Sequence, residues 1–479
     1  MFARTRLFVV LILFVLGFSL LSGQEIFGES AGGKEVLGVP ISFGGFYRIR
    51  YYYTSTQGVS PAGPYGEPLV EGGKLSFLLK PQVEIMPSEN ITIGAYFRLT
   101  NIDRSIIWGS PDYFTNILVS PYLRIDYGPL GVDMGYFREH MTELTVMRWD
   151  KDDNPPGAGG VEGGCRSCVG LPGEMSFENL EEIDKDIGLE GLRINVSVPV
   201  KSVELDFKSF YARPTKQDEL CDVLTRHFIC GELGGNYESD VFSGWARVRM
   251  MNIQDEQGSC TFSLNPMLWQ NVASGDFGFS VYWVKLQAER AWCRTKHRPV
   301  DRIGAWKVHE GRAFLVRLTA EPQVGPVLLG LDLAKLNLES GYDAEYRAQS
   351  YYSGEDGVRA TVKGEAKFGK LDLNSAFFYK DVENAVKPLS ADTLNIRTLG
   401  VNIGGGLEIG NVYISGSVSG SREKSKKVGD VDDEQKRDIY VLELSVKPVT
   451  MMTISFNVMY TETDGDIARI FSLMTSVDF

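Results

Sequence analysis

The chain ends in the nine residues FSLMTSVDF, at positions 471–479. Phe471, Leu473, Thr475, Val477 and Phe479 share one parity, and the residues between them are mostly polar. Because side chains alternate between the two faces of a β-strand, this segment has one mostly apolar face and one mostly polar face. We therefore predict a strand that continues to the last residue.

The same alternation recurs from residue 41 onward. Clear examples are ISFGGFYRIRYYYT (41–54), KLSFLLKPQVEI (74–85), ITIGAYFRLT (91–100), SVELDFKSFYA (202–212), IYVLELSV (439–446) and TISFNVMYT (453–461). Repeated segments of about ten residues with this pattern are the signature of a transmembrane β-barrel. The sequence predicts an all-β fold, a transmembrane antiparallel up-and-down β-barrel of about 16–18 strands.

The connections between these segments alternate in length. Short ones lie at 86–90, 127–131, 199–202, 321–326, 368–370, 408–411 and 447–450; long ones lie at 54–73, 101–116, 141–185, 213–239, 338–357, 381–394 and 422–436. Outer-membrane barrels have short periplasmic turns and long extracellular loops, so this alternation predicts periplasmic termini and an even strand number. Segment 253–276 interrupts the order, unless it contains two further strands.

Soluble sandwiches and propellers also contain alternating strands, and they bury the apolar face in a core. A propeller has a blade repeat at a fixed period, and none is visible in this sequence. Aromatic residues on the apolar parity gather at segment ends, namely Tyr51, Tyr53, Tyr127, Phe368 and Tyr460. Such positions match the aromatic girdles of a membrane barrel and favour that interpretation.

The first residues have the order of a secretory signal. Arg4 and Arg6 precede an apolar run at 7–21, and the chain then turns small and polar. We assign 1–23 to a signal peptide, 24–40 to a lead-in segment and 41–479 to the barrel. An uncleaved helical anchor is the alternative, although the apolar run is short for one.

Charge limits the class of partner. Without Arg4 and Arg6, 47 basic residues (49 minus 2) face 62 acidic ones, a net charge of about −15. Nucleic acid binding requires a basic footprint, so we expect no nucleic acid partner.

The last strand resembles the C-terminal strand of Gram-negative outer-membrane proteins. This resemblance implies that the barrel-assembly machinery reads Phe471, Leu473, Val477 and Phe479 as an assembly signal, with Phe479 as its main determinant. It also implies residence in the cell outer membrane, in contact with outer-membrane lipid.

A narrower resemblance is to general porins, in which the third external loop folds into the barrel and presents acidic residues to a basic wall. Here that loop is 141–185, with Asp150, Asp152, Asp153, Glu162, Glu174, Glu178, Glu181 and Glu182. The polar parity of the first four strands supplies Arg48, Arg50, Lys80, Arg98 and Arg124. Opposed charges of this kind orient water and polar solutes in a pore. The alternative is that the arginines pair with nearby carboxylates and the loop acids are solvated.

Six cysteines occur in this exported chain: Cys165, Cys168, Cys221, Cys230, Cys260 and Cys293. An even number favours disulfides, and the local pairs are Cys165 with Cys168 and Cys221 with Cys230, which leaves Cys260 with Cys293. A zinc site is the alternative, since cysteine and histidine are its ligands, but one CxxC does not establish it, and we expect no metal.

Neither a catalytic motif nor a cofactor-binding motif is present, and only four histidines occur. We expect no enzyme and no cofactor. The resemblance to porins implies a passive diffusion channel for ions and small hydrophilic solutes, and a homotrimer. The alternatives are a structural barrel that tiles or anchors an envelope sheath, and a substrate-specific sugar channel. The low content of Gln and Asn, 11 and 17 residues, together with the length, resembles the porin of the Thermotogota outer sheath.

Overall fold

The structure is a computed structural model, and it describes residues 34–36, 39–58, 71–100, 116–145, 187–214, 226–239, 241–255, 267–298, 307–342, 344, 354–386, 393–429 and 434–479. These residues form a single antiparallel sheet of 22 strands. Within them, no helix is long and apolar enough to cross a membrane, a finding that does not bear on a β-barrel. Strands β1 and β14 contain three and two residues, so 20 strands make the wall.

The first half of the sheet runs from the N-terminal side of the described chain to the middle. Its strands are β1 (Lys34–Val36), β2 (Val39–Gln57), β3 (Gly72–Ser88), β4 (Ile91–Thr100), β5 (Asn116–Tyr127), β6 (Leu130–Glu139), β7 (Ile187–Val200), β8 (Val203–Pro214), β9 (Arg226–Glu238), β10 (Phe242–Asp255) and β11 (Met267–Val281).

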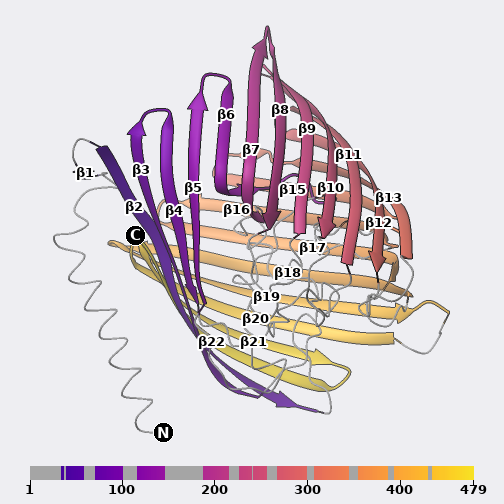
Figure 1. Cartoon of the computed structure of the whole chain (residues 1–479). Helices are drawn as coiled ribbons and strands as arrows, with labels where there is room; N and C mark the ends of the chain where they lie inside the picture. Colours follow the sequence, from indigo (N-terminus) through magenta and orange to yellow (C-terminus); the bar gives the residue numbers. More distant parts are fainter. Residues whose placement is uncertain are drawn as a thin grey trace.

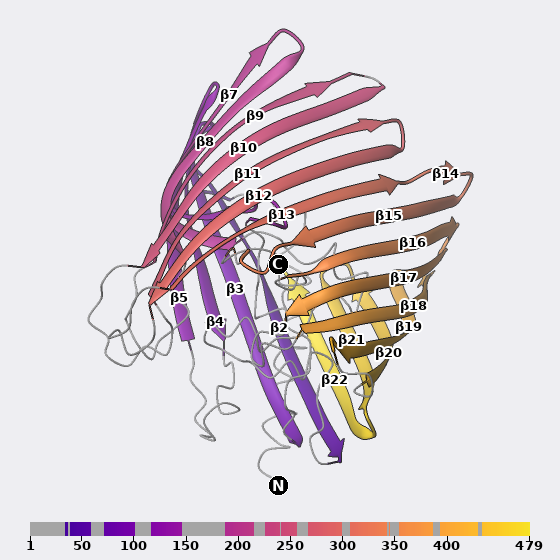
Figure 2. The ribbon, with the colours of Figure 1, turned by 90° about the vertical axis from the view of Figure 1, so that its right-hand side faces the viewer.

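The second half continues with β12 (Val284–Arg298), β13 (Lys307–Ala320), β14 (Gln323–Val324), β15 (Val327–Leu338), β16 (Asp356–Phe368), β17 (Leu371–Val386), β18 (Thr393–Ile409), β19 (Val412–Lys427), β20 (Glu434–Val449), β21 (Met452–Thr463) and β22 (Asp466–Asp478). Each long strand pairs with the next one in the chain, and β13 pairs with β15. Figure 2 shows the strands from β7 to β19 in chain order across one side.

The barrel closes between its first and last long strands. β2 pairs with β22 from Phe46 opposite Asp478 to Gln57 opposite Ile467, and Figure 1 shows the C-terminus at this seam. The Phe479 amide donates to the Gly45 carbonyl at 2.9 Å, and the Gly45 amide donates to the Phe479 carbonyl at 2.7 Å. The prediction of a strand that reaches the end of the chain and of a closed up-and-down barrel is confirmed.

The two faces of the wall have the predicted polarity at this seam. Phe471 and Leu473 are 38 and 41% exposed on the outer face, and Ser472 between them is 3% exposed. Apolar side chains are likewise exposed on the outside around the ring, among them Leu233 57%, Val248 59%, Phe277 53%, Val362 49%, Ile403 62%, Val418 59% and Leu442 39%. An outward apolar band on a closed antiparallel barrel is the surface that contacts lipid in a transmembrane barrel.

The connections lie as predicted, with short turns at one end and longer segments at the other, except that a two-residue turn at 464–465 joins β21 to β22 at the end with the longer segments. Two-residue turns join β5 to β6, β16 to β17 and β18 to β19, and Gly128, Gly369 and Gly410 there have φ of 57, 65 and 64°. Such left-handed residues match the twist of a tight hairpin and favour glycine. We call this end the short-turn end, and the opposite end the long-loop end.

The predicted number of strands was too low, because 20 strands form the wall. The predicted loop 213–239 contains β9, whose outward positions include Gly231 and Gly235, so its apolar parity is weak in sequence. Once β9 is counted, segment 253–276 reads as the end of β10, a connection at the long-loop end and the start of β11. The interruption in the alternation of turns and loops disappears.

The seam generates a prediction about stability. The rings of Phe43 and Phe479 stack with centroids 5.5 Å apart. We expect Phe479→Ala to lower the free energy of unfolding by about 1 kcal/mol more than Phe456→Ala, because Phe456 is outward and 40% exposed but forms no described ring pair. Denaturant titration of the detergent-folded protein measures both losses. Equal losses would contradict a role for the ring pair in closing the seam.

Candidate functional site

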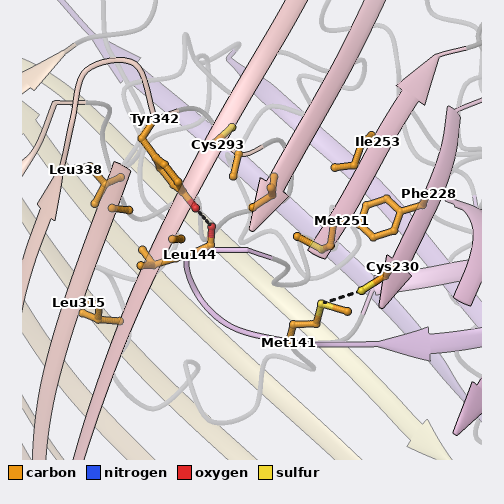
Figure 3. Close-up of a cluster of buried hydrophobic side chains, with 14 of the residues drawn as sticks. Met141, Leu144, Phe228, Cys230, Met251, Ile253, Cys293, Leu315, Leu338 and Tyr342 are labelled. Atoms are coloured by element: carbon orange, nitrogen blue, oxygen red, sulfur yellow. Dashed lines mark hydrogen bonds between the residues drawn. The ribbon is translucent and has the colours of Figure 1, made fainter. Parts of the chain in front are cut away.

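The interior of the barrel is the candidate site, and one part of it is filled with apolar side chains. Inward residues near the long-loop end of β6 to β15 are buried, including Phe137, Phe210, Phe228, Cys230, Met251, Ile253, Val272, Cys293, Leu315 and Leu336. Segment 140–145, which follows β6, lies against them and buries Met141 and Leu144 (Figure 3). We call this set the apolar layer.

Three polar contacts fix segment 140–145 to distant strands. The Thr142 hydroxyl donates to Glu289 on β12 at 2.5 Å, and the Tyr342 hydroxyl donates to the Leu144 carbonyl at 2.5 Å. Both terminal nitrogens of Arg317 on β13 donate to the Glu143 carboxylate, one of them at 3.0 Å. Since β13 lies seven strands beyond β6, the segment crosses the interior as a chord rather than following the wall.

On the short-turn side of the apolar layer, an unbroken chain of ion pairs follows the inner wall from β5 to β11. Its eight members, joined by seven contacts, alternate in charge from Arg124 to Asp276. Arg124 contacts Asp133 at 3.0 Å, Arg193 contacts Asp133 at 2.8 Å and Glu139 at 3.1 Å, Lys208 contacts Glu139 at 2.8 Å and Glu232 at 3.7 Å, and Arg249 contacts both Glu232 and Asp276. The five buried members, Asp133, Glu139, Glu232, Arg249 and Asp276, each contact an opposite charge, as buried charges require. We call this set the ion-pair belt.

The opposite part of the inner wall differs in chemistry. Gly400, Gly404 and Gly406 on β18 lie beside inward serines of β19, and the inward residues of β20 continue the row. The serines are Ser415, Ser417, Ser419, Ser421 and Ser425. Each of them is partly exposed, whereas Gln270, Val272, Ser274, Asp276 and Gly278, the corresponding inward run on β11, are all buried. Water therefore reaches the inner face at β19 and is excluded from it at β11.

The predicted basic residues are distributed over two environments. The strand register places Arg48 and Lys80 on the inner face, in rows with Ser476 and Phe46. Arg124 is the first member of the ion-pair belt, which is the pairing that we gave as the alternative to a pore-lining role. The register also places Arg50 and Arg98 on the inward parity, opposite Met474 and Leu118; their side chains are outside the described part of the structure.

The predicted loop acids Asp150, Asp152, Asp153, Glu162, Glu174, Glu178, Glu181 and Glu182 lie outside the described residues. The described start of that loop does enter the barrel, but its acid, Glu143, contacts Arg317 on β13 and not the basic residues of β2 to β5. Arg317 and Glu289 were missed because their partners, Glu143 and Thr142, lie 174 and 147 residues away in sequence and leave no local pattern.

Cys230 and Cys293 are buried in the apolar layer, and neither forms a disulfide among the described residues. Cys230, Met251, Val272 and Cys293 lie in one row across four neighbouring strands. The two cysteines are therefore three strand spacings, or about 14 Å, apart, whereas a disulfide requires Cα atoms within about 7 Å. The predicted partners Cys221 and Cys260, together with Cys165 and Cys168, lie outside the described residues, so those pairs stay predictions. No cluster of metal-ligating side chains is found in the described ranges.

No family model and no curated protein matches the sequence. The solved structures similar to it include OccK3 (OpdO) of Pseudomonas aeruginosa, with 10% identity, a TM-score of 0.44 and coverage of 91% of this chain and 95% of that one. A BenF-like porin of Pseudomonas fluorescens Pf-5 has 10% identity, a TM-score of 0.45 and coverage of 91 and 99%. OpdK of Pseudomonas aeruginosa with vanillate has 10% identity, a TM-score of 0.46 and coverage of 91 and 98%.

The contact between Glu143 and Arg317 generates a prediction that a double-mutant cycle tests. Both side chains are partly exposed, at 17 and 26%, so we expect Glu143→Gln and Arg317→Gln to show a coupling energy of about 1 kcal/mol in the free energy of unfolding. The exposed pair Lys335 and Asp356, at 52 and 42%, is the control and should couple by less. A coupling energy for Glu143 and Arg317 no larger than that of the control would contradict the anchor.

Proposed function

We propose that the protein is an outer-membrane porin, a water-filled channel for passive diffusion of ions and small hydrophilic solutes. The observation that carries this proposal is the partly exposed row of serines on the inward face of β19, on a barrel whose outward face is apolar. A hydroxyl-lined surface that water reaches inside a lipid-facing wall provides a polar route across the hydrocarbon.

We further propose that the long connection after β6 narrows this route. Segment 140–145 and the apolar layer fill the interior against β6 to β15, so the water-lined part of the wall in this proposal lies around β19, whose inward serines are partly exposed. In this proposal the loop acids face the basic residues Arg48, Arg50, Lys80 and Arg98 across the channel. The proposal also includes a homotrimer, assembly through Phe479 and a place in a Thermotogota-like outer sheath. The absence of catalytic motifs supports a non-enzymatic role.

The channel function predicts discrete conductance in a planar lipid bilayer. The conductance of the full chain should rise in proportion to the conductivity of the salt solution, because ions cross in water and not at a saturable site. Deletion of 150–182, which keeps the anchor at Glu143, should increase the conductance. Correctly folded protein that gives no conductance steps would favour the structural barrel over the channel.

The two environments of the predicted basic residues generate a test of selectivity. Arg48→Gln should move the reversal potential in a salt gradient toward the equilibrium potential of the cation, since it removes a partly exposed positive charge from the inner face. Arg124→Gln should move it less, because Asp133 at 3.0 Å and the rest of the ion-pair belt already balance this charge. An equal shift for the two variants, or no shift for either, would exclude the proposed division of roles.

A further inference from the structure

The outer surface at the long-loop end of β12 and β13 carries an unusual cluster of cations. Along β12 the outward residues are Val284, Leu286 and Ala288, and then Arg290, Trp292, Arg294 and Lys296. The apolar band therefore ends at Ala288, and basic residues follow it on the same face. The arginines at 290 and 294 are both exposed.

The register gathers three guanidinium groups around one indole. Arg290 and Arg294 lie two residues to either side of Trp292, and Arg312 of β13 is directly opposite Trp292. Outward neighbours at these positions are about 7 Å apart along a strand and about 5 Å apart between strands. The Trp292 Nε1 donates to Glu310 at 3.0 Å, and the Lys296 Nζ lies 4.6 Å from the centroid of the Trp269 ring. We call Arg290, Arg294, Arg312 and Trp292 the outer arginine cluster.

Two other outward arginines at this end of the barrel are neutralised by carboxylates. Arg397 lies 3.0 Å from Asp381 and Arg422 lies 2.7 Å from Asp438. Within the described parts of the chain, the side chains of Arg290, Arg294 and Arg312 form no ion pair within 4 Å. Two carboxylates lie beside them: Glu310, directly opposite Arg294, accepts from Trp292, and Glu339 accepts from the backbone amide of Arg312. The three arginines and Lys296 outnumber these two carboxylates, so the cluster presents an excess of positive charge.

Apolar side chains lie directly beside the cluster on its short-turn side. Phe314 is opposite Arg290, and both Val316 and Phe277 are opposite Ala288. Phe314 and Phe277 are 45 and 53% exposed on the outer face. A molecule with a negative head and hydrocarbon chains would find both complementary surfaces within a few residues.

We propose that the outer arginine cluster binds the anionic, phosphate-bearing headgroup of a lipid in the outer leaflet, with its acyl chains against Phe314, Val316 and Phe277. Guanidinium groups donate paired hydrogen bonds to phosphate oxygens, and tryptophan is favoured at the level of lipid headgroups. The proposal rests on the membrane orientation of the barrel and not on conduction through it.

Native mass spectrometry of the delipidated full chain in detergent tests this site, with phosphatidylglycerol as the probe and phosphatidylcholine as the neutral comparison. We expect retention of phosphatidylglycerol to fall by on the order of tenfold or more in R290Q/R294Q/R312Q, while retention of phosphatidylcholine is unchanged. If the triple variant does not fold, the single variants R290Q and R312Q should each show a smaller loss.

The matched control is D381N/R397Q/R422Q/D438N, which removes two outward arginines together with their carboxylates. It should retain phosphatidylglycerol as the unchanged protein does. Equal retention by the triple variant, or an equal loss in the control, would overturn the proposal. Conductance of the triple variant should be unchanged, which separates failure of this site from failure of the channel.

Discussion

The absence of water from the hydrocarbon core of a bilayer is the constraint on which the structure depends, because each backbone amide there needs a partner within the protein. The seam between β2 and β22 meets this requirement, and the paired backbone of Gly45 and Phe479 completes it at the short-turn end. Once the ring is closed, the parity of a residue decides whether it faces lipid or the interior. The inner and outer surfaces follow from that choice.

The second organising feature is an exchange of polarity along single strands. On β12 the inward residues change from Lys285, Gln287 and Glu289 to Ala291 and Cys293, whereas the outward residues change from Leu286 and Ala288 to Arg290. Near the short-turn end, the wall is therefore apolar outside and polar inside. Near the long-loop end of β6 to β15, it resembles a soluble barrel with its own apolar layer, and the ion-pair belt lies at the boundary.

The barrel class could be predicted from sequence because alternation is a local property, visible in nine residues such as 471–479. The strand number was underestimated because Gly231 and Gly235 remove outward side chains from β9. The exchange of polarity on β12 can be read from sequence as a change of the apolar parity after Glu289, but contacts such as that of Glu143 with Arg317 cannot. Such pairs depend on where a chain crosses a space, and no local pattern specifies that path.

The strand number of a barrel is often taken to fix both its circumference and the width of its water-filled path. The chord formed by segment 140–145 separates these two quantities. Twenty strands determine the circumference of this barrel, since the spacing between neighbouring strands is constant. The chord and the apolar layer keep the arc from β6 to β15 dry near the long-loop end, and inward residues elsewhere, such as Val382 and Ser472, are buried as well. The wetted part of the inner wall is therefore much shorter than the circumference. A lineage of such barrels can therefore add strands to enlarge its footprint in the membrane without widening the water-filled path.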